Sequence, residues 1–89
     1  MIHELKTDSA VFQAVKEGRK NFEIRRNDKH FVTGDLLVLK ETENDGADMA
    51  EFGLPLIYTG EELVVTVEYV LYGPIYGLEA GWCIMSISL

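Results

Sequence analysis

The hydrophobic period of this chain changes at Gly18, and no other feature constrains the fold as strongly. Before Gly18, apolar side chains recur every three to four residues, which predicts a helix over residues 9–17. Asp8 or Ser9 is the expected N-cap, because a short polar side chain can accept hydrogen bonds from the free N–H groups of the first turn. After Gly18 the polarity alternates, which predicts a strand over residues 21–25. The chain therefore combines a helix with strands.

The remaining strands follow at short spacing. We expect them over residues 2–5, 36–39, 63–72 and 82–89, with a short extended piece over 54–58. The segments between them read as an acidic loop over residues 41–53, with turn points at Asp45-Gly46 and Gly53, and a glycine-containing loop over 75–81. About five strands and one N-terminal helix in a single domain, residues 1–89, favour an α+β fold. We expect a small closed or nearly closed β-barrel with the helix at one end.

Alternation also assigns faces to the strands. Phe22 and Ile24 are expected to point into the core, with Glu23 and Arg25 on the polar face. In the longest strand, one face is expected to carry Leu63, Val65, Val67, Tyr69 and Leu71, and the other Val64, Thr66, Glu68, Val70 and Tyr72.

Composition excludes several classes of protein. The 89 residues are 47% hydrophobic, which is too apolar for a disordered chain. A lone cysteine, Cys83, allows neither a disulfide framework nor a multi-cysteine zinc site, and we expect it to be an inert core thiol. His3, His30 and Cys83 do not have the spacing of metal ligands. No apolar run is long enough to span a membrane, and the N-terminus does not resemble a signal peptide. We expect a cytoplasmic domain without metal, cofactor or membrane partner.

The charge is unevenly distributed. The net charge is −7, but residues 1–40 hold all eight lysines and arginines against six acids, whereas residues 41–89 hold nine acids and no base. A chain with this total is a poor match for a long tract of nucleic acid, which needs many cations to neutralise phosphates. A small polar ligand suits the charge better. The alternative is that the acids only keep the second half of the chain soluble.

A polar trio stands at the junction of the expected helix and the strand after it. Lys20 precedes Glu23 and Arg25, which share one face of that strand. A carboxylate beside a guanidinium holds both side chains in place, and the pair can offer an acceptor and a forked donor to a base edge or a phosphate. The alternative is an ordinary surface ion pair. Because such pairs contribute only ~0–1 kcal/mol, we expect the trio to serve ligand binding rather than stability.

Other side chains are candidates to join the trio. Arg26 follows it directly, while His3 and Tyr58 could converge on it from other strands. For His3 the alternative is a surface or hydrogen-bonded histidine, and His30 is expected to be solvated. The candidates for base stacking are Tyr58, Tyr72, Tyr76 and Trp82, although in a domain this small most aromatic residues pack into the core.

These segments resemble a known family. The blocks that carry the resemblance are His3-Glu4-Leu5-Lys6, Phe12-x-Ala14-Val15-Lys16-x-Gly18-x-Lys20-x-Phe22-Glu23-Ile24-Arg25, Asn27-Asp28, Gly34-Asp35-Leu36-Leu37, Tyr58-Thr59-Gly60 and Gly77-Leu78-x-x-Gly81-Trp82. Together they are similar to the short bacterial and phage branch of the ASCH superfamily, whose domains have a PUA-like β-barrel fold. The resemblance implies a cleft beside the helix, lined by Lys20, Glu23 and Arg25, that takes RNA or a nucleotide-like ligand. Residues 43–57 depart from the pattern, because the hairpin there is longer and more acidic.

Three functions follow as hypotheses. The first is a module that binds RNA, a nucleotide or a modified nucleoside through His3, Lys20, Glu23, Arg25, Arg26 and Tyr58. The second is an amidohydrolase acting on an acetylated cytidine, as some small PUA-like relatives are, with Lys20 and Glu23 as catalytic residues. In that comparison Glu23 occupies the position of a nucleophilic threonine, and a carboxylate is a poor nucleophile toward an amide. The third is a protein-interaction domain or homodimer that makes contact through residues 63–72 or the acidic loop.

Overall fold

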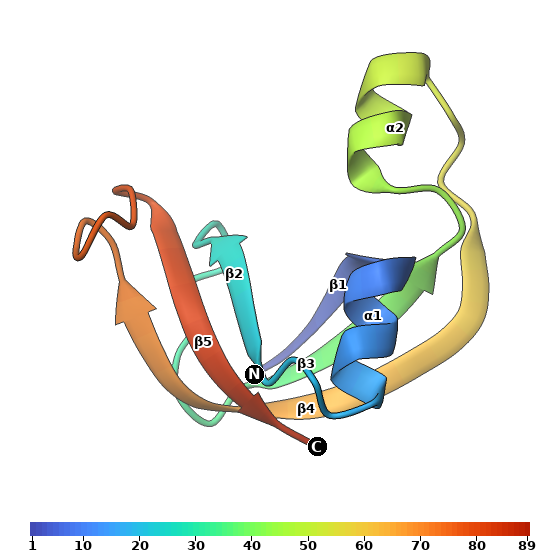
Figure 1. Cartoon of the computed structure of the whole chain (residues 1–89). Coiled ribbons are helices and arrows are strands. Elements are labelled where there is room, and N and C mark those ends of the chain that lie inside the picture. Colours follow the sequence, from blue (N-terminus) through green and yellow to red (C-terminus); the bar gives the residue numbers. More distant parts are fainter.

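The sheet of this protein curls into half a barrel and leaves a gap between the two strands at its edges. The computed structural model describes residues 1–89, and its elements in chain order are β1 (Ile2–Asp8), α1 (Ser9–Lys16), β2 (Phe22–Arg26), β3 (Leu36–Thr42), α2 (Gly46–Phe52), β4 (Tyr58–Tyr72) and β5 (Trp82–Ser88). The strand order is β1-β3-β4-β5-β2, with β1 and β3 parallel and the other pairs antiparallel (Figure 1). The α+β class and five strands are confirmed, but the barrel is not closed, so β1 and β2 remain edge strands.

Helix α1 packs against β1 and β3 through one apolar stripe. Phe12 and Val15 are fully buried there, and the helix stops before Gly18, whose φ of +77° is easy only for glycine. The helix predicted over residues 9–17 is thus confirmed. Asp8 is the N-cap residue, but its side chain makes no capping hydrogen bond and instead accepts the N–H of Gly46. The expectation that Asp8 or Ser9 caps α1 through its side chain is therefore wrong.

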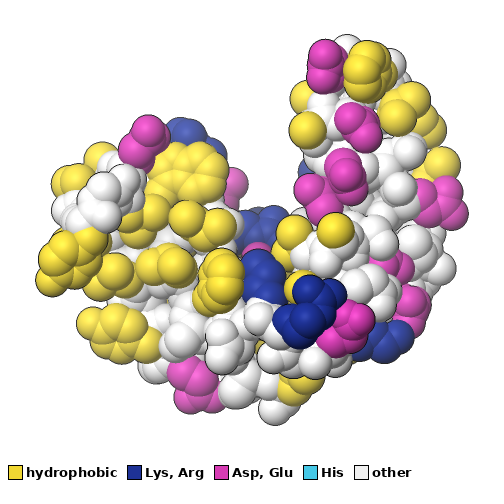
Figure 2. All heavy atoms as spheres, in the orientation of Figure 1, with side chains coloured by type: hydrophobic (Ala, Val, Ile, Leu, Met, Phe, Trp, Pro, Cys, Tyr) yellow, Lys and Arg dark blue, Asp and Glu magenta, His cyan; other side chains and the backbone are white.

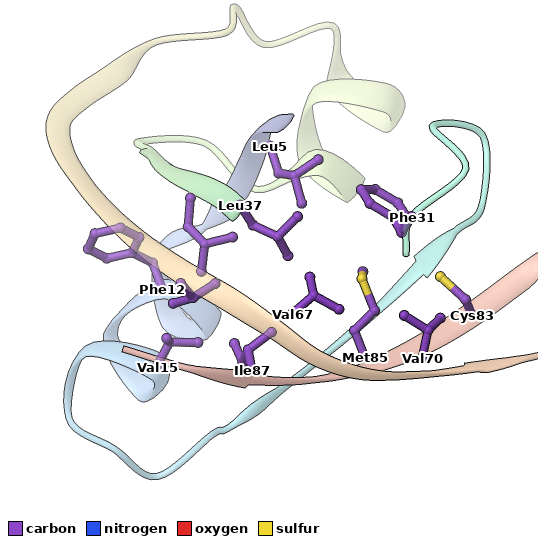
Figure 3. Close-up of a cluster of buried hydrophobic side chains, with 12 residues drawn as sticks. Leu5, Phe12, Val15, Phe31, Leu37, Val67, Val70, Cys83, Met85 and Ile87 are labelled. Atoms are coloured by element: carbon purple, nitrogen blue, oxygen red, sulfur yellow. The ribbon is translucent and has the colours of Figure 1, made fainter. Parts of the chain in front are cut away.

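The core lies between α1 and the concave face of the sheet (Figure 3). Its members come from every strand but β2, from α1 and from the loop before β3: Leu5, Phe12, Val15, Phe31, Leu37, Leu39, Val65, Val67, Val70, Cys83, Met85 and Ile87. Cys83 is fully buried, and burial raises the pKa of its thiol, as does the nearby charge of Asp28. The expected place of Cys83 in the core is confirmed, and the inertness of its thiol stays a prediction.

A β-bulge changes which residues of β4 face the core. Val67 pairs with Ile87 and Tyr69 with Ser86, so Glu68 is an extra residue with no partner. Past the bulge the alternation is reversed, and Val70 is buried while Tyr69 is 64% exposed. The faces predicted for residues 63–72 are right before Glu68 and wrong after it, because one inserted residue turns every later side chain to the opposite face.

The faces predicted for β2 are inverted. Phe22 and Ile24 are 42% and 48% exposed, whereas Glu23 is only 2% exposed. A pattern of alternation does not say which set points inward, and the choice depends on partners that other strands supply.

The predicted acidic loop contains a second helix. β3 continues to Thr42, α2 spans Gly46–Phe52, and β4 begins at Tyr58. Asp45 has the extended backbone of an N-cap residue, and Gly53 ends the helix with a φ of +65°. No residue of α2 is buried, and the helix projects from the sheet together with its flanking segments (Figure 1). We call residues 43–57 the arm; it carries four acids and no base.

Candidate ligand-binding groove

Glu23 is the buried centre of the predicted trio. Its Oε1 accepts a hydrogen bond from Lys20 Nζ at 2.9 Å, and its Oε2 accepts one from Arg25 Nε at 3.0 Å. Lys20 Nζ also donates to the backbone carbonyl of Phe22. A carboxylate can be buried when both oxygens meet cations in this way, and this explains why Glu23 rather than Phe22 points inward. The trio predicted from the sequence is therefore brought together.

Arg25 also bridges the gap between the two edge strands. Its Nη1 donates to the carbonyl of Lys6 at 3.0 Å, and its Nη2 donates to Thr7 Oγ1 at 3.3 Å. Both acceptors belong to β1, so a single guanidinium ties β2 to β1 and to Glu23. No local pattern could have revealed this contact, because the partners lie 18 and 19 residues away in the chain.

A groove follows the gap between β1 and β2. It consists of two adjoining hollows of about 520 and 370 Å³, and Lys6, Arg25 and Arg26 line both of them. The smaller hollow reaches α1 and holds the trio, whereas the larger one extends to Lys29, Lys40 and Tyr58. Figure 2 shows basic side chains between an apolar lobe on the left and the acid-bearing arm on the right. We call these two hollows together the groove.

Three cations of the groove are free to meet an anion. Lys6, Arg26 and Lys29 are exposed, and each lacks a carboxylate within ion-pair distance, although the chain has 15 acids. Lys40 is more engaged, since its Nζ lies 3.7 Å from Glu4 and 3.8 Å from Glu62. Unpaired cations around a concave surface attract phosphates. The lining of the groove has six cations against the four acids Glu4, Asp8, Glu23 and Asp28, so it is a basic region of an acidic protein.

Two cation–aromatic pairs stand beside the floor of the groove. The Arg26 guanidinium lies 5.6 Å from the centre of the Trp82 ring, and Lys40 Nζ lies 4.6 Å from the centre of the Tyr58 ring. Trp82 lines the smaller hollow and Tyr58 the larger. Each pair places a positive charge beside a flat ring, which suits a phosphate attached to a planar base. Among the other stacking candidates, Tyr72 donates its hydroxyl to the carbonyl of Phe31 and does not line the groove.

His3 lies outside the groove, unlike the other predicted site residues. It is 8% exposed, its Nε2 is 2.9 Å from Asp35 Oδ2, and its ring makes an edge contact with Phe31. Burial acts to raise the pKa of Asp35, but hydrogen bonds from the N–H of Val32, the amino group of Met1 and His3 outweigh burial and lower that pKa to about 2. His3 is therefore the hydrogen-bonded histidine of the alternative interpretation.

Sequence reasoning missed part of the site and one buried acid. Lys6, Lys29 and Lys40 belong to the cation-rich first 40 residues, so the charge distribution pointed to them without placing them. Nothing in the sequence distinguishes Glu41 from the acids that follow it. It is 5% exposed and accepts hydrogen bonds from Ser9 and Gln13 of α1 and from Thr59 of β4. These hydrogen bonds lower the pKa of Glu41, with Gln13 having the largest effect, then Ser9 and then Thr59. They also connect α1 and β4 to β3.

No group of three or more histidine, cysteine, aspartate or glutamate side chains is placed to hold a metal ion. None of the helices has the length and apolar character needed to cross a bilayer.

The fold and the groove define a small α+β half-barrel domain with a basic cleft at its open seam. The model of a family described as a domain of unknown function, DUF3850, matches residues 2–87, so the chain belongs to that family. It is also similar to an uncharacterised 12.9 kDa protein of Escherichia phage P2, encoded in the GpA 3′ region, with 42% identity over 40 residues. That match covers 45% of this chain and 37% of the phage protein, so the similarity spans well under half of the relative's length.

Proposed function

We propose that the groove binds single-stranded RNA, a nucleotide or a modified nucleoside, and that the half-barrel is a PUA-like domain of the ASCH type. The observation that carries the proposal is the set of unpaired cations Lys6, Arg26 and Lys29 in one groove of a protein with net charge −7. The chain has 15 acids, enough to pair with each of its eight lysines and arginines, yet these three cations have no ion-pair partner. A phosphate is the ligand group that fits them best.

Each part of the groove has a role in this proposal. Lys6, Arg26 and Lys29 meet the phosphates, and Tyr58 and Trp82 offer ring faces to a base. Lys20 and Arg25 provide further donors at the base edge. Glu23 chiefly holds these two donors in place, because each of its oxygens already accepts one hydrogen bond.

The size and charge of the surroundings favour a short ligand. The larger hollow, about 520 Å³, is within the usual range for a small-molecule site. The arm with its four acids stands beside the groove and would repel a phosphate backbone that continued past it. The ASCH assignment is supported by Gly18-x-Lys20-x-x-Glu23-x-Arg25, whose three polar side chains meet in the smaller hollow. A cytoplasmic location accords with such a ligand and with a single unpaired thiol.

The amidohydrolase hypothesis finds less support. Its candidate residues, Lys20 and Glu23, are hydrogen-bonded to each other. Because a carboxylate is a poor nucleophile toward an amide, the nucleophile has to come from another side chain. Thr7 is the one hydroxyl residue of the smaller hollow, but it is 2% exposed and donates its hydroxyl to the carbonyl of Leu5. A hydroxyl so engaged is not poised to attack an amide.

The test is a titration of labelled oligonucleotides and a nucleoside panel at several salt concentrations. For a single strand, each phosphate contact contributes about −0.7 to the slope of log K against log salt. Arg26→Ala combined with Lys29→Ala should therefore weaken binding and reduce the slope by about 1.4. Arg19→Ala is the matched control, because Arg19 is an exposed cation outside the groove and is paired with Glu17. Absence of binding at low salt, or an equal effect of the control, would overturn the proposal.

A further inference from the structure

The outer face of β2, β5 and β4 is apolar and uncovered. The pairing registers align Ile24, Ile84 and Leu71 in one row across the three strands, and Phe22, Ser86 and Tyr69 in the next. Because paired residues point to the same side of a sheet, these side chains form one continuous surface. Hydrophobic side chains gather on this lobe of the molecule, which is the left lobe in Figure 2. We call it the outer face.

A tight turn beside the outer face presents a tyrosine to solvent. Tyr76 and Gly77 are the central residues of a two-residue turn closed by a bridge between Ile75 and Leu78, and their φ angles are +48° and +86°. Positive φ at both positions favours asparagine, aspartate or glycine and disfavours a tyrosine. The side chain of Tyr76 is 90% exposed, so the fold of the single chain does not need an aromatic ring there.

A hollow of suitable size lies next to this tyrosine. It measures about 270 Å³ and is lined by Ile24, Leu78, Trp82, Gly77 and Glu79. An apolar cavity of ~150 Å³ accepts a benzene ring, so the hollow has room for one aromatic side chain. Its single acid, Glu79, can accept a hydrogen bond from a phenol. Tyr76 cannot be the occupant within its own chain, because it points into solvent.

We propose that a second copy of this chain covers the outer face, in a twofold dimer in which each Tyr76 inserts into the hollow beside Ile24 and Trp82 of the other copy. The knob and the hollow belong to the same turn, so one twofold axis near that turn makes both contacts at once and the assembly closes. With aromatic side chains that expose ~150–250 Å² each when free, the face and the turn offer roughly 600 Å² per copy, or about 1,200 Å² in total, which is the lower end of the range for stable interfaces.

The charges favour this occupant over an unlike one. The two rows of the outer face contain no carboxylate, although the chain as a whole carries −7. The acids beside them have partners in the dimer, since Glu79 of the hollow meets the phenol of Tyr76 from the other copy and Glu68 at the bulge accepts a hydrogen bond from Ser88. A basic partner would be drawn instead to the arm, which holds four acids. The competing occupant is the arm of a second copy, because its Phe52 is 67% exposed. Contact between the arm of one copy and the outer face of another would join two different surfaces, and such contacts build open filaments rather than closed dimers.

Sedimentation of the purified chain over a wide concentration range tests the proposal. The expected species is a dimer of about 20 kDa, twice the 10.0 kDa of one chain, with a dissociation constant in the micromolar range. Tyr76→Asn should weaken the dimer about tenfold or more while the melting temperature measured under monomeric conditions stays equal or rises, because asparagine accepts the positive φ. Tyr69→Lys should also dissociate it, since the twofold axis places both new charges in one interface.

Phe52→Ser is the matched control, because it removes from the arm an aromatic side chain whose exposure, 67%, is close to the 64% of Tyr69. A wild-type chain that stays monomeric at the highest concentration would overturn the proposal. The proposal would also be overturned if Tyr76→Asn formed dimers as tight as those of the wild type. It would be overturned as well if only Phe52→Ser weakened the dimer, because the outer face would then bind the arm of the other copy. Ile24 and Trp82 also line the smaller hollow of the groove, so oligonucleotide binding by Tyr76→Asn and the wild type is compared at concentrations where both are monomeric, and there it should be equal.

Discussion

Replacing Glu23 with glutamine tests whether the centre of the groove also supports the fold. The substitution keeps the size of the side chain but removes the negative charge that Lys20 and Arg25 share. Glu23 is 2% exposed, whereas the side chains of Lys20 and Arg25 are 16% and 26% exposed. Breaking a fully buried ion pair costs about 3–5 kcal/mol, and breaking an exposed one costs ~0–1 kcal/mol.

The geometry of the trio lies between these limits. The acid is buried and its two cations are partly hydrated, so Glu23→Gln should lower the free energy of unfolding by about 2 kcal/mol. For a domain of this size that is a drop of about 10 °C in melting temperature. The value exceeds the small contribution expected from the sequence, because alternation placed Glu23 on the solvent face and the structure buries it.

Urea denaturation followed by circular dichroism measures the effect. Glu17→Gln is the control, because Glu17 also pairs with an arginine, Arg19, but both side chains are more than half exposed. The control should change the free energy of unfolding by less than about 0.5 kcal/mol. Equal stability of Glu23→Gln and the wild type would refute the reasoning and would leave the trio with a role in binding alone.

Three further predictions concern side chains outside the groove. Glu41→Gln should lower the free energy of unfolding by about 1–2 kcal/mol in thermal melts, because the new amide N–H group would face a donor from Ser9, Gln13 or Thr59. The fold lowers the pKa of Asp35 from 3.8 to about 2, so its contribution to the free energy of unfolding is complete above pH 3.8 and is lost as the pH falls through about 2. Asp35→Asn should therefore make stability less dependent on pH in this acid range, and an unchanged dependence would contradict the assignment. The thiol of Cys83 should react with a disulfide reagent only at the rate of unfolding, because it is fully buried and its pKa is raised; rapid labelling of the native protein would contradict this.

Local patterns were enough to predict the main elements of the sheet. The helix expected over residues 9–17 is α1, and every strand predicted from alternation is present, although β4 starts at Tyr58 and β1 runs on to Asp8. These elements follow from side-chain period and from breakers such as Gly18, which act within a few residues of the chain. The helix α2 was also readable from its alanine, methionine and glutamate residues between Asp45 and Gly53, but the acidic character of the segment suggested a loop.

The candidate site was only partly within reach of the sequence. The spacing of Lys20, Glu23 and Arg25 predicted that they act together, and they share one network. Their spacing could not show that Arg25 reaches the carbonyl of Lys6 on the other edge strand, or that Lys29 and Tyr58 border the same hollow.

Period and composition determined which segments form strands and that the cations gather in the first 40 residues. Only the tertiary structure decided which face of each strand is buried. Alternation in β2 is equally compatible with Phe22 or Glu23 pointing inward, and the choice fell to Glu23 because two cations were in place to compensate its charge. The bulge at Glu68 reversed the pattern of β4 in the same way, since the pairing of β4 with β5 depends on a partner strand far along the chain. Neighbours in the sequence determine whether a segment forms a helix or a strand, whereas neighbours in space determine which of its side chains are buried.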